Sequence, residues 1–262
     1  MELRILVIAL LGVLLFSSCE KYIELDLEQG DPKVVIEANM SDLNPVTAIV
    51  SRSSEFFQGE FDPIEDALLV LSDDLGNKDT LLYTQSGIYV GSRIGQVGGT
   101  YTLNVIADGQ LFTASSYLNA SVPIDSIKYE AEESEFPGQE GKYVKFWYKD
   151  IPGQRDYYRI QYYYDDVIEI GPNSIRISTD VFDDGLVNEV TTRDSVGVGV
   201  KVEARLFKIT EQTFDYLNTL QDIVSQQPGG SGVPQNPIQV WSNGALGYFS
   251  AAGESSMEIV TQ

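Results

Sequence analysis

The sequence predicts a mainly β protein. We expect an immunoglobulin- or transthyretin-like β-sandwich followed by a second antiparallel β domain that carries one α-helix. Apolar and polar residues alternate along most of the chain after residue 30, and turn-forming residues recur every eight to twelve positions, roughly the spacing of short strands. One segment has helical spacing of its apolar residues, and a proline-containing stretch near residue 122 separates two groups of strands.

The N-terminal sandwich is expected over residues 30–121. The predicted strands are residues 33–38, 46–51, 67–72, 80–84, 87–90, 100–106 and 111–117. Asp108-Gly109 is the strongest hairpin signal in the chain, because glycine accepts the positive φ of a type I′ turn. Short strands at this spacing are typical of an immunoglobulin-like sandwich.

The second domain is expected over residues 122–262. Pro123 marks the boundary, because proline cannot continue a ladder from the middle of a sheet. The predicted strands are residues 124–130, 142–148, 157–164, 174–181 and 197–207, one or two closing strands within 236–252, and another at 257–260. A helix is predicted at about residues 210–225, capped by Thr210, with Phe214, Leu217, Leu220 (or Gln221) and Val224 on its apolar face.

Composition excludes several classes of function. The 262 residues include 39 acidic and 17 basic side chains, and a formal net charge of −22 rules out a basic surface for nucleic acid. There is no histidine, and Cys19 is the single cysteine. These two counts exclude Ser-His-Asp and Cys-His catalysis, histidine- or cysteine-rich metal sites and internal disulfides.

Residues 1–18 have the features of a secretory signal peptide. The apolar run Ile5–Phe16 is too short to span a bilayer but suits the core of a signal, and two small residues separate it from Cys19. This arrangement resembles the lipobox of bacterial lipoproteins, in which the cysteine is diacylated and begins the mature chain. We expect lipidation of Cys19, with residues 19–29 as an acylated tether. The alternative is an ordinary signal peptide followed by an incidental cysteine.

Aspartate pairs are the first candidates for site chemistry. Asp183-Asp184 and similar pairs suggest calcium, but aspartate is also expected in turns for local backbone reasons. Aligning residues 180–191 with an EF-hand loop places Phe182 and Thr191 at positions that require ligands, so the alignment fails. We predict no metal and no cofactor, with plain turns and structural Ca²⁺ as the two alternatives for the aspartate pairs.

Aromatic residues are the better candidates. On a strand, Tyr158, Ile160, Tyr162 and Tyr164 share one face, which we expect in the core, and the opposite face is mixed. Residues 142–148 are expected to form the neighbouring strand with a similar mixed face. The predicted ligand-binding residues are Tyr143, Trp147, Tyr157, Arg159, Tyr163 and Trp241. Aromatic residues also suit half-buried sheet surfaces, so ordinary sheet packing is the alternative.

Ordered blocks of sequence resemble domain-of-unknown-function family 4249, lipoproteins of Bacteroidota. The blocks are Cys19-Glu20-Lys21, residues 23–27, 33–38, 50–57, 98–103, 122–127 and 243–249. This resemblance implies an outer-membrane lipoprotein, often encoded beside a TonB-dependent transporter, and implies no known reaction. The acidic residues after Cys19 also resemble the surface-export signal of such lipoproteins, which implies a surface-exposed anchor.

We therefore predict a non-catalytic outer-membrane lipoprotein that assists a TonB-dependent transporter by capturing a ligand such as a glycan or peptide. The transporter association follows from the family resemblance alone. One alternative is a structural or adhesive surface module, which should expose a large flat apolar patch. A remote alternative is a surface hydrolase that uses carboxylates only, which requires two acids facing each other across a cleft.

Overall fold

The computed structural model describes residues 31–53, 61–132, 141–171, 174–225 and 237–262. The predicted signal peptide, Cys19 and the tether lie outside these residues. Pro32–Gln262 form one compact unit. No helix within the described ranges combines the length and the apolar character needed to cross a membrane.

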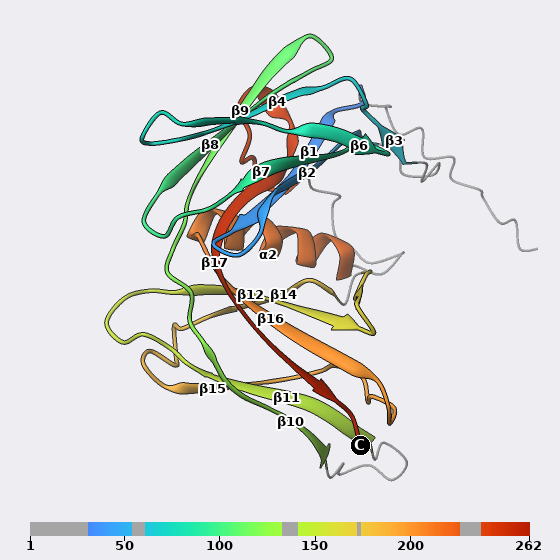
Figure 1. The fold of residues 1–262 in the computed structure, drawn as a ribbon, viewed down its shortest axis with the longest axis vertical. Coiled ribbons are helices and arrows are strands. Elements are labelled where there is room, and N and C mark those ends of the chain that lie inside the picture. Colours follow the sequence, from blue (N-terminus) through green and yellow to red (C-terminus); the bar gives the residue numbers. More distant parts are fainter. Residues whose placement is uncertain (1–30, 54–60, 133–140, 172–173, 226–236) are drawn as a thin grey trace, which may run out of the picture. The chain divides into compact units, whose positions relative to one another are not determined.

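Two β-sandwiches form this unit, which confirms the predicted mainly β, immunoglobulin-like class (Figure 1). In the first, one layer contains β1 (Val34–Ser41), β2 (Pro45–Arg52), β3 (Asp62–Pro63), β6 (Leu82–Gln85) and β7 (Ile88–Ile94). The other layer contains β5 (Lys78–Thr80), β4 (Leu68–Asp73), β8 (Thr100–Ala107) and β9 (Gln110–Tyr117). Side chains such as Ile36, Leu69 and Leu103 are fully buried between the layers.

Local turn chemistry explains the hairpin between β8 and β9. Asp108 and Gly109 have φ values of 49° and 71°, as a type I′ turn requires, and Ala107 pairs with Gln110 across the turn. The prediction of one strand at residues 80–84 was wrong. Leu81 is only 4% exposed, and the chain crosses between the layers there, so β5 pairs with β4 and β6 pairs with β7.

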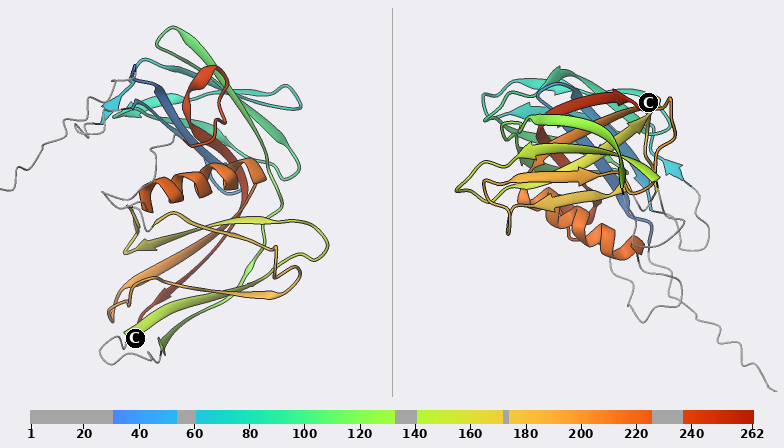
Figure 2. Two further views of the ribbon diagram at one scale, coloured as in Figure 1. Left: turned by 180° about the vertical axis from the view of Figure 1, so that it is seen from behind. Right: turned by 90° about the horizontal axis from the view of Figure 1, so that it is seen from below.

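The second sandwich has a three-stranded layer, seen from below in Figure 2. This layer contains β10 (Ile124–Glu132), β11 (Gly141–Lys149) and β15 (Val187–Thr191). The facing layer contains β12 (Tyr157–Tyr164), β13 (Val167–Ile168), β14 (Arg176–Thr179), β16 (Lys201–Ile209) and part of β17 (Leu246–Val260). The strand predicted from residue 197 begins only at Lys201, because Gly199 turns the chain with a φ of 85°.

A single long strand, β17, belongs to both sandwiches (Figure 1). It pairs in parallel with β1 through Ala252 and antiparallel with β16 from Gly253 onward. Phe249 and Ala251 lie in the first core, whereas Met257 and Ile259 pack against the second. The predicted domain over residues 122–262 is therefore corrected, since its residues 240–251 contribute to the first core. The separate closing strands predicted for this region are one continuous strand.

Gly253 marks the place where the connection between the two sandwiches crosses β17. A Cβ at this position would lie 2.3 Å from the backbone nitrogen of Ser121 and 2.5 Å from the carbonyl oxygen of Asn119. Only glycine permits this backbone approach. Two residues later, the hydroxyl of Ser255 donates to the carbonyl of Val122 at 2.6 Å. The connecting segment and the shared strand therefore lie side by side.

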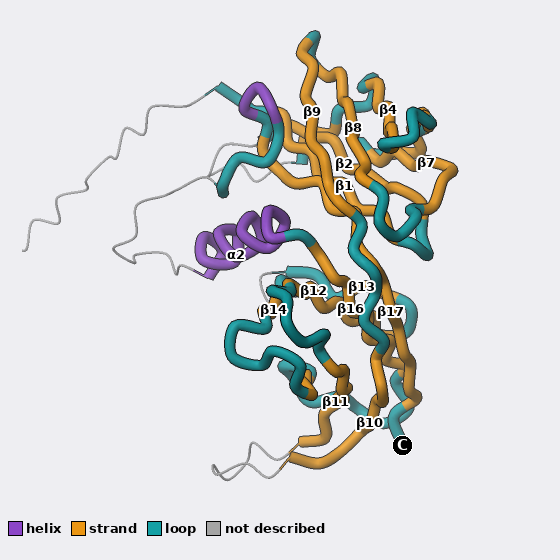
Figure 3. The backbone as a smooth tube through the Cα atoms, turned by 90° about the vertical axis from the view of Figure 1, so that its left-hand side faces the viewer, coloured by secondary structure: helices purple, strands orange, loops and turns teal. Residues whose placement is uncertain are grey.

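Helix α2 (Glu211–Ser225) confirms the predicted helix and its cap, since the Thr213 N–H donates to the Thr210 hydroxyl at 3.3 Å. The helix packs on β12, β14 and β17, on the outer face of the shared sheet (Figure 3). Its buried face is centred on Tyr216 and Leu217, while Val224 is 38% exposed. The predicted apolar face is otherwise confirmed, because Phe214 and Leu220 pack against the same cluster, and Tyr216 extends it with a ring 5.3 Å from that of Tyr248.

Candidate functional site

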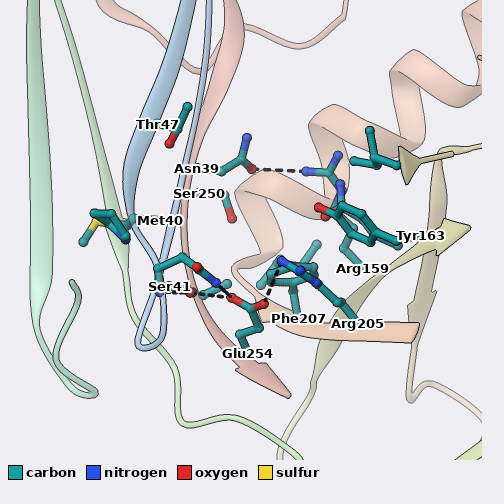
Figure 4. A pocket seen from close by; sticks show the side chains of 16 residues that line it. Asn39, Met40, Ser41, Thr47, Arg159, Tyr163, Arg205, Phe207, Ser250 and Glu254 are labelled. Atoms are coloured by element: carbon teal, nitrogen blue, oxygen red, sulfur yellow. Dashed lines mark hydrogen bonds and ion pairs between the residues drawn. The ribbon is translucent and has the colours of Figure 1, made fainter. Parts of the chain in front are cut away.

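A pocket of about 330 Å³ lies on the outer face of the shared sheet (Figure 4). Six strands, β1, β2, β12, β13, β16 and β17, contribute to it. The polar and aromatic side chains that line it include Asn39, Ser41, Thr47, Arg159, Gln161, Tyr163, Arg205, Phe207, Ser250 and Glu254. The pocket therefore depends on the strand that joins the two sandwiches.

Alternation along β12 explains why polar groups reach this pocket. Tyr158, Ile160 and Tyr162 point into the second core and are at most 3% exposed. Their neighbours Arg159 and Gln161 must then point to the opposite face, because successive side chains alternate along a strand. The antiparallel register places Arg159 beside Phe207 of β16 and Gln161 beside Arg205.

Arg205 forms one wall of the pocket and is fully engaged by neighbouring groups. Its Nε and Nη2 bind the two carboxylate oxygens of Glu203 at 2.9 and 3.1 Å, and its Nη1 lies 3.5 Å from Glu254. The guanidinium carbon lies 4.2 Å from the centre of the Tyr163 ring. These contacts hold Tyr163 and the charged wall in one arrangement.

Glu254 fixes the turn between β1 and β2 to the shared strand. Its side chain is 3% exposed and accepts hydrogen bonds from the Ser41 hydroxyl at 2.5 Å and the Asn44 amide at 2.7 Å. The Glu254 backbone N–H donates to Asp42 at 2.8 Å. The buried charge of Glu254 thus has several partners, as buried charged groups require.

Some N–H groups of the Arg159 guanidinium are not used in hydrogen bonds. Its Nη1 donates to the Asn39 side-chain oxygen at 3.1 Å (Figure 4) and to the Tyr248 hydroxyl at 2.7 Å. Within the described residues no carboxylate forms an ion pair with it, and its Nε and Nη2 have no hydrogen-bond partner. Burial raises the pKa of the nearby Glu37 carboxyl above its usual range, and the charge of Arg159 opposes that rise. The pocket therefore presents a partly available guanidinium.

The structure brings together only part of the predicted ligand-binding set. Arg159 and Tyr163 line the pocket. Tyr157 lies on the same sheet face but under α2, where its ring is 5.0 Å from that of Phe214 and its hydroxyl donates to Glu211 at 2.6 Å. Helix packing therefore occupies the aromatic surface of Tyr157.

Tyr143 and Trp147 do not share this face, and the prediction that their strand neighbours β12 was wrong. Strand β11 pairs with β10 and β15 in the opposite layer of the sandwich. Trp147 donates to Glu189 at 3.0 Å, and the Lys128 ammonium lies 5.2 Å from its ring centre. Local strand patterns do not reveal which layer a strand joins, so this error has a physical origin.

Trp241 is a core residue, which corrects its predicted role as a ligand contact. It is 1% exposed within the first core, and its indole N–H donates to the carbonyl of Ile36 at 2.9 Å. A buried tryptophan needs a partner for its N–H, and here a backbone carbonyl is the partner. Its side chain has no surface left for a ligand.

Sequence reasoning missed several residues of the pocket, above all Asn39, Thr47, Arg205 and Glu254. A local signal existed only for Arg205, because Glu203 and Arg205 alternate with the buried Val202, Ala204 and Leu206. The other three come from β1, β2 and β17, and the parallel pairing of β1 with β17 brings them together. Pairing between such distant segments leaves no local pattern.

The fold and the site define a class of protein: immunoglobulin-like β-sandwiches with a polar pocket on the sheet that they share. A family model described as "Domain of unknown function (DUF4249)" matches residues 20–258. The chain belongs to this family, as the sequence blocks predicted. No match is found among the curated proteins. Among solved structures, the two fibronectin type-III domain segment from chicken tenascin is similar at 12% identity and a TM-score of 0.23, covering 68% of this chain and 90% of that one.

Proposed function

We propose that this protein is a non-catalytic, lipid-anchored binding protein of the Bacteroidota outer membrane that captures a ligand for a TonB-dependent transporter. The observation that carries the binding role is the pocket around Arg159. The anchor and the transporter rest on the expected acylation of Cys19 and on what the family resemblance implies. Two acyl chains would hold such a protein stably on a membrane.

The chemistry of the pocket favours a carboxylate-bearing glycan or peptide. The guanidinium of Arg159 has unused N–H groups on Nε and Nη2, and guanidinium forks bind carboxylates with two parallel hydrogen bonds. The amides of Asn39 and Gln161 and the ring of Tyr163 supply further hydrogen-bonding and stacking groups. A volume of about 330 Å³ suits one sugar ring or the end of a peptide.

The acids at and beside the pocket support binding over hydrolysis. Glu254, which lines the pocket, and Glu203 beside it both bind Arg205, and Glu254 also accepts from Ser41 and Asn44. A carboxylate hydrolase needs two acids that face each other across the substrate. These two acids instead neutralise one arginine between them.

Replacing Arg159 with glutamine is expected to weaken ligand binding about 10- to 100-fold, the loss associated with charge-assisted hydrogen bonds. The full chain, purified in mild detergent, would be titrated calorimetrically with uronic-acid oligosaccharides and with short peptides that have a free C-terminus. Neutral oligosaccharides and C-terminally amidated peptides test whether the carboxylate is required. The two acidic series distinguish a glycan from a peptide.

A matched control is Arg52→Gln. Arg52 pairs with Asp62 and Asp108 on the first sandwich and does not line the pocket, so binding should be unchanged. Equal binding by Arg159→Gln and the unmodified chain would remove Arg159 from the site. Binding of neutral and acidic ligands with equal affinity would contradict the carboxylate assignment.

Replacing Cys19 with alanine is expected to release the protein from the outer membrane and abolish its co-purification with a transporter. The measurement is a mild-detergent pull-down from native outer membranes with a C-terminal tag. A TonB-dependent transporter should accompany only the form that retains Cys19. Recovery of the membrane-bound protein without a transporter would contradict the accessory role and favour an adhesive surface module.

A further inference from the structure

Three aspartates converge at one end of the second sandwich, away from the pocket. Asp150 directly follows β11, Asp180 directly follows β14, and Asp184 lies in the turn before β15. One carboxylate oxygen from each lies within 4.8 Å of those from the other two. Asp150 is 2% exposed and Asp180 is 5% exposed, whereas Asp184 is open to solvent.

Asp180 is 5% exposed as a residue, and its carboxylate forms no hydrogen bond or ion pair with any described residue. The other two acids are partly satisfied. Asp150 accepts from the Tyr158 hydroxyl and from the Gly185 N–H at 3.0 Å, and Asp184 accepts from the Gly153 N–H at 2.8 Å. Native structures rarely leave a buried carboxylate without a donor or a cation.

Among the described residues, no cation forms an ion pair with any of the three acids. The buried Lys208 ammonium lies near this end of the sandwich, but it binds Asp156 at 2.6 Å. Three carboxylates at this separation repel one another unless a positive charge lies between them.

We propose that Asp150, Asp180 and Asp184 bind a calcium ion. Calcium takes oxygen ligands at about 2.3–2.6 Å, so two oxygens bound to one ion lie at most about 5.2 Å apart, a condition that this cluster meets because its oxygens all lie within 4.8 Å of one another. Magnesium requires shorter bonds of about 2.0–2.1 Å in a strict octahedron. Backbone carbonyls and water would complete the shell. This site is independent of the pocket and of the function proposed for it.

The inference departs from the sequence-based prediction of no metal, and the fold explains why. Two of the ligands, Asp180 and Asp184, come from the segment that failed to align with an EF-hand loop. The third, Asp150, comes from a separate loop after β11. The ion would tie the loop after β11 to the turn before β15. A calcium site assembled from two loops has no single-loop motif.

Calcium at millimolar concentration is expected to raise the midpoint of thermal unfolding of the full chain by about 5 °C relative to EDTA, as a ligand bound only by the folded state must do. Terbium, which replaces calcium and is sensitised by nearby tyrosine, should luminesce when bound beside Tyr148 and Tyr158. Magnesium alone at the same concentration should produce less than half of the shift.

Asp180→Asn and Asp184→Asn are the test variants, and Asp183→Asn is the matched control, because Asp183 is an exposed acid of the same turn outside the cluster. Both test variants should lose the calcium shift and the terbium signal, and the control should keep both. In EDTA, Asp180→Asn should unfold at a higher temperature than the unmodified chain, because it removes the unpartnered charge. A calcium shift that persists in Asp180→Asn, or no shift and no terbium signal in the unmodified chain, would overturn the proposal.

Discussion

Replacing Trp241 with alanine is expected to lower the free energy of unfolding by about 3–5 kcal/mol, the range for removing a large buried aromatic side chain. Trp241 is 1% exposed, and its indole N–H satisfies the carbonyl of Ile36 on β1. The substitution leaves a cavity in the first core and a buried carbonyl without its donor. It also loosens the segment that leads into the shared strand β17.

Urea unfolding followed by circular dichroism would measure this loss. Trp147→Ala is the matched control, because Trp147 is the other tryptophan of the chain and lies partly exposed on the three-stranded layer. Its loss of one hydrogen bond and one cation–π contact should cost only about 1 kcal/mol. Each variant retains a single tryptophan, so fluorescence should show a blue-shifted Trp241 and a red-shifted Trp147. Equal destabilisation by the two variants would show that Trp241 is not a core anchor.

Replacing Lys208 with methionine is expected to cost about 3–5 kcal/mol, the range for breaking a buried ion pair by removing one partner. The side chains of Lys208 and Asp156 are 5% and 4% exposed, and their charged atoms lie 2.6 Å apart. Methionine fills the space of the lysine stem, so packing changes little. The Asp156 carboxylate would remain buried beside the hydroxyl of Tyr158, with no cation.

The double variant Lys208→Met, Asp156→Leu tests whether this loss of stability comes from the Asp156 carboxylate that is left buried without its lysine. It should recover most of the lost stability, because replacing both members of a buried pair by apolar residues is often neutral. Lys201→Met is a control on the same strand, since Lys201 binds Asp166 and Glu258 at the surface and its loss should change stability little. If the double variant were as unstable as Lys208→Met, the ion pair would not be the cause.

The two halves of the candidate site differ in how far sequence could predict them. Arg159 and Tyr163 were predicted because alternation along β12 is a local property. The run of tyrosines expected in the core indicates which residues of the strand must face the other way. Asn39, Thr47 and Glu254 were missed because they meet Arg159 only through pairings of β1 with β2 and β17. The prediction for Trp241 was wrong because the sequence around a tryptophan looks the same whether its ring is buried or exposed.

The sequence by itself determined the β class, the hairpin at Asp108-Gly109, the capped helix and the outward face of β12. Each of these depends on backbone preferences and side-chain periodicity within a few residues. Only the tertiary structure decided that β17 joins both sandwiches, that Gly253 admits the connecting segment, and that three aspartates from two loops converge. Backbone hydrogen bonds between strands are chemically alike at every position, so the choice of partner depends on how the whole chain buries its apolar faces.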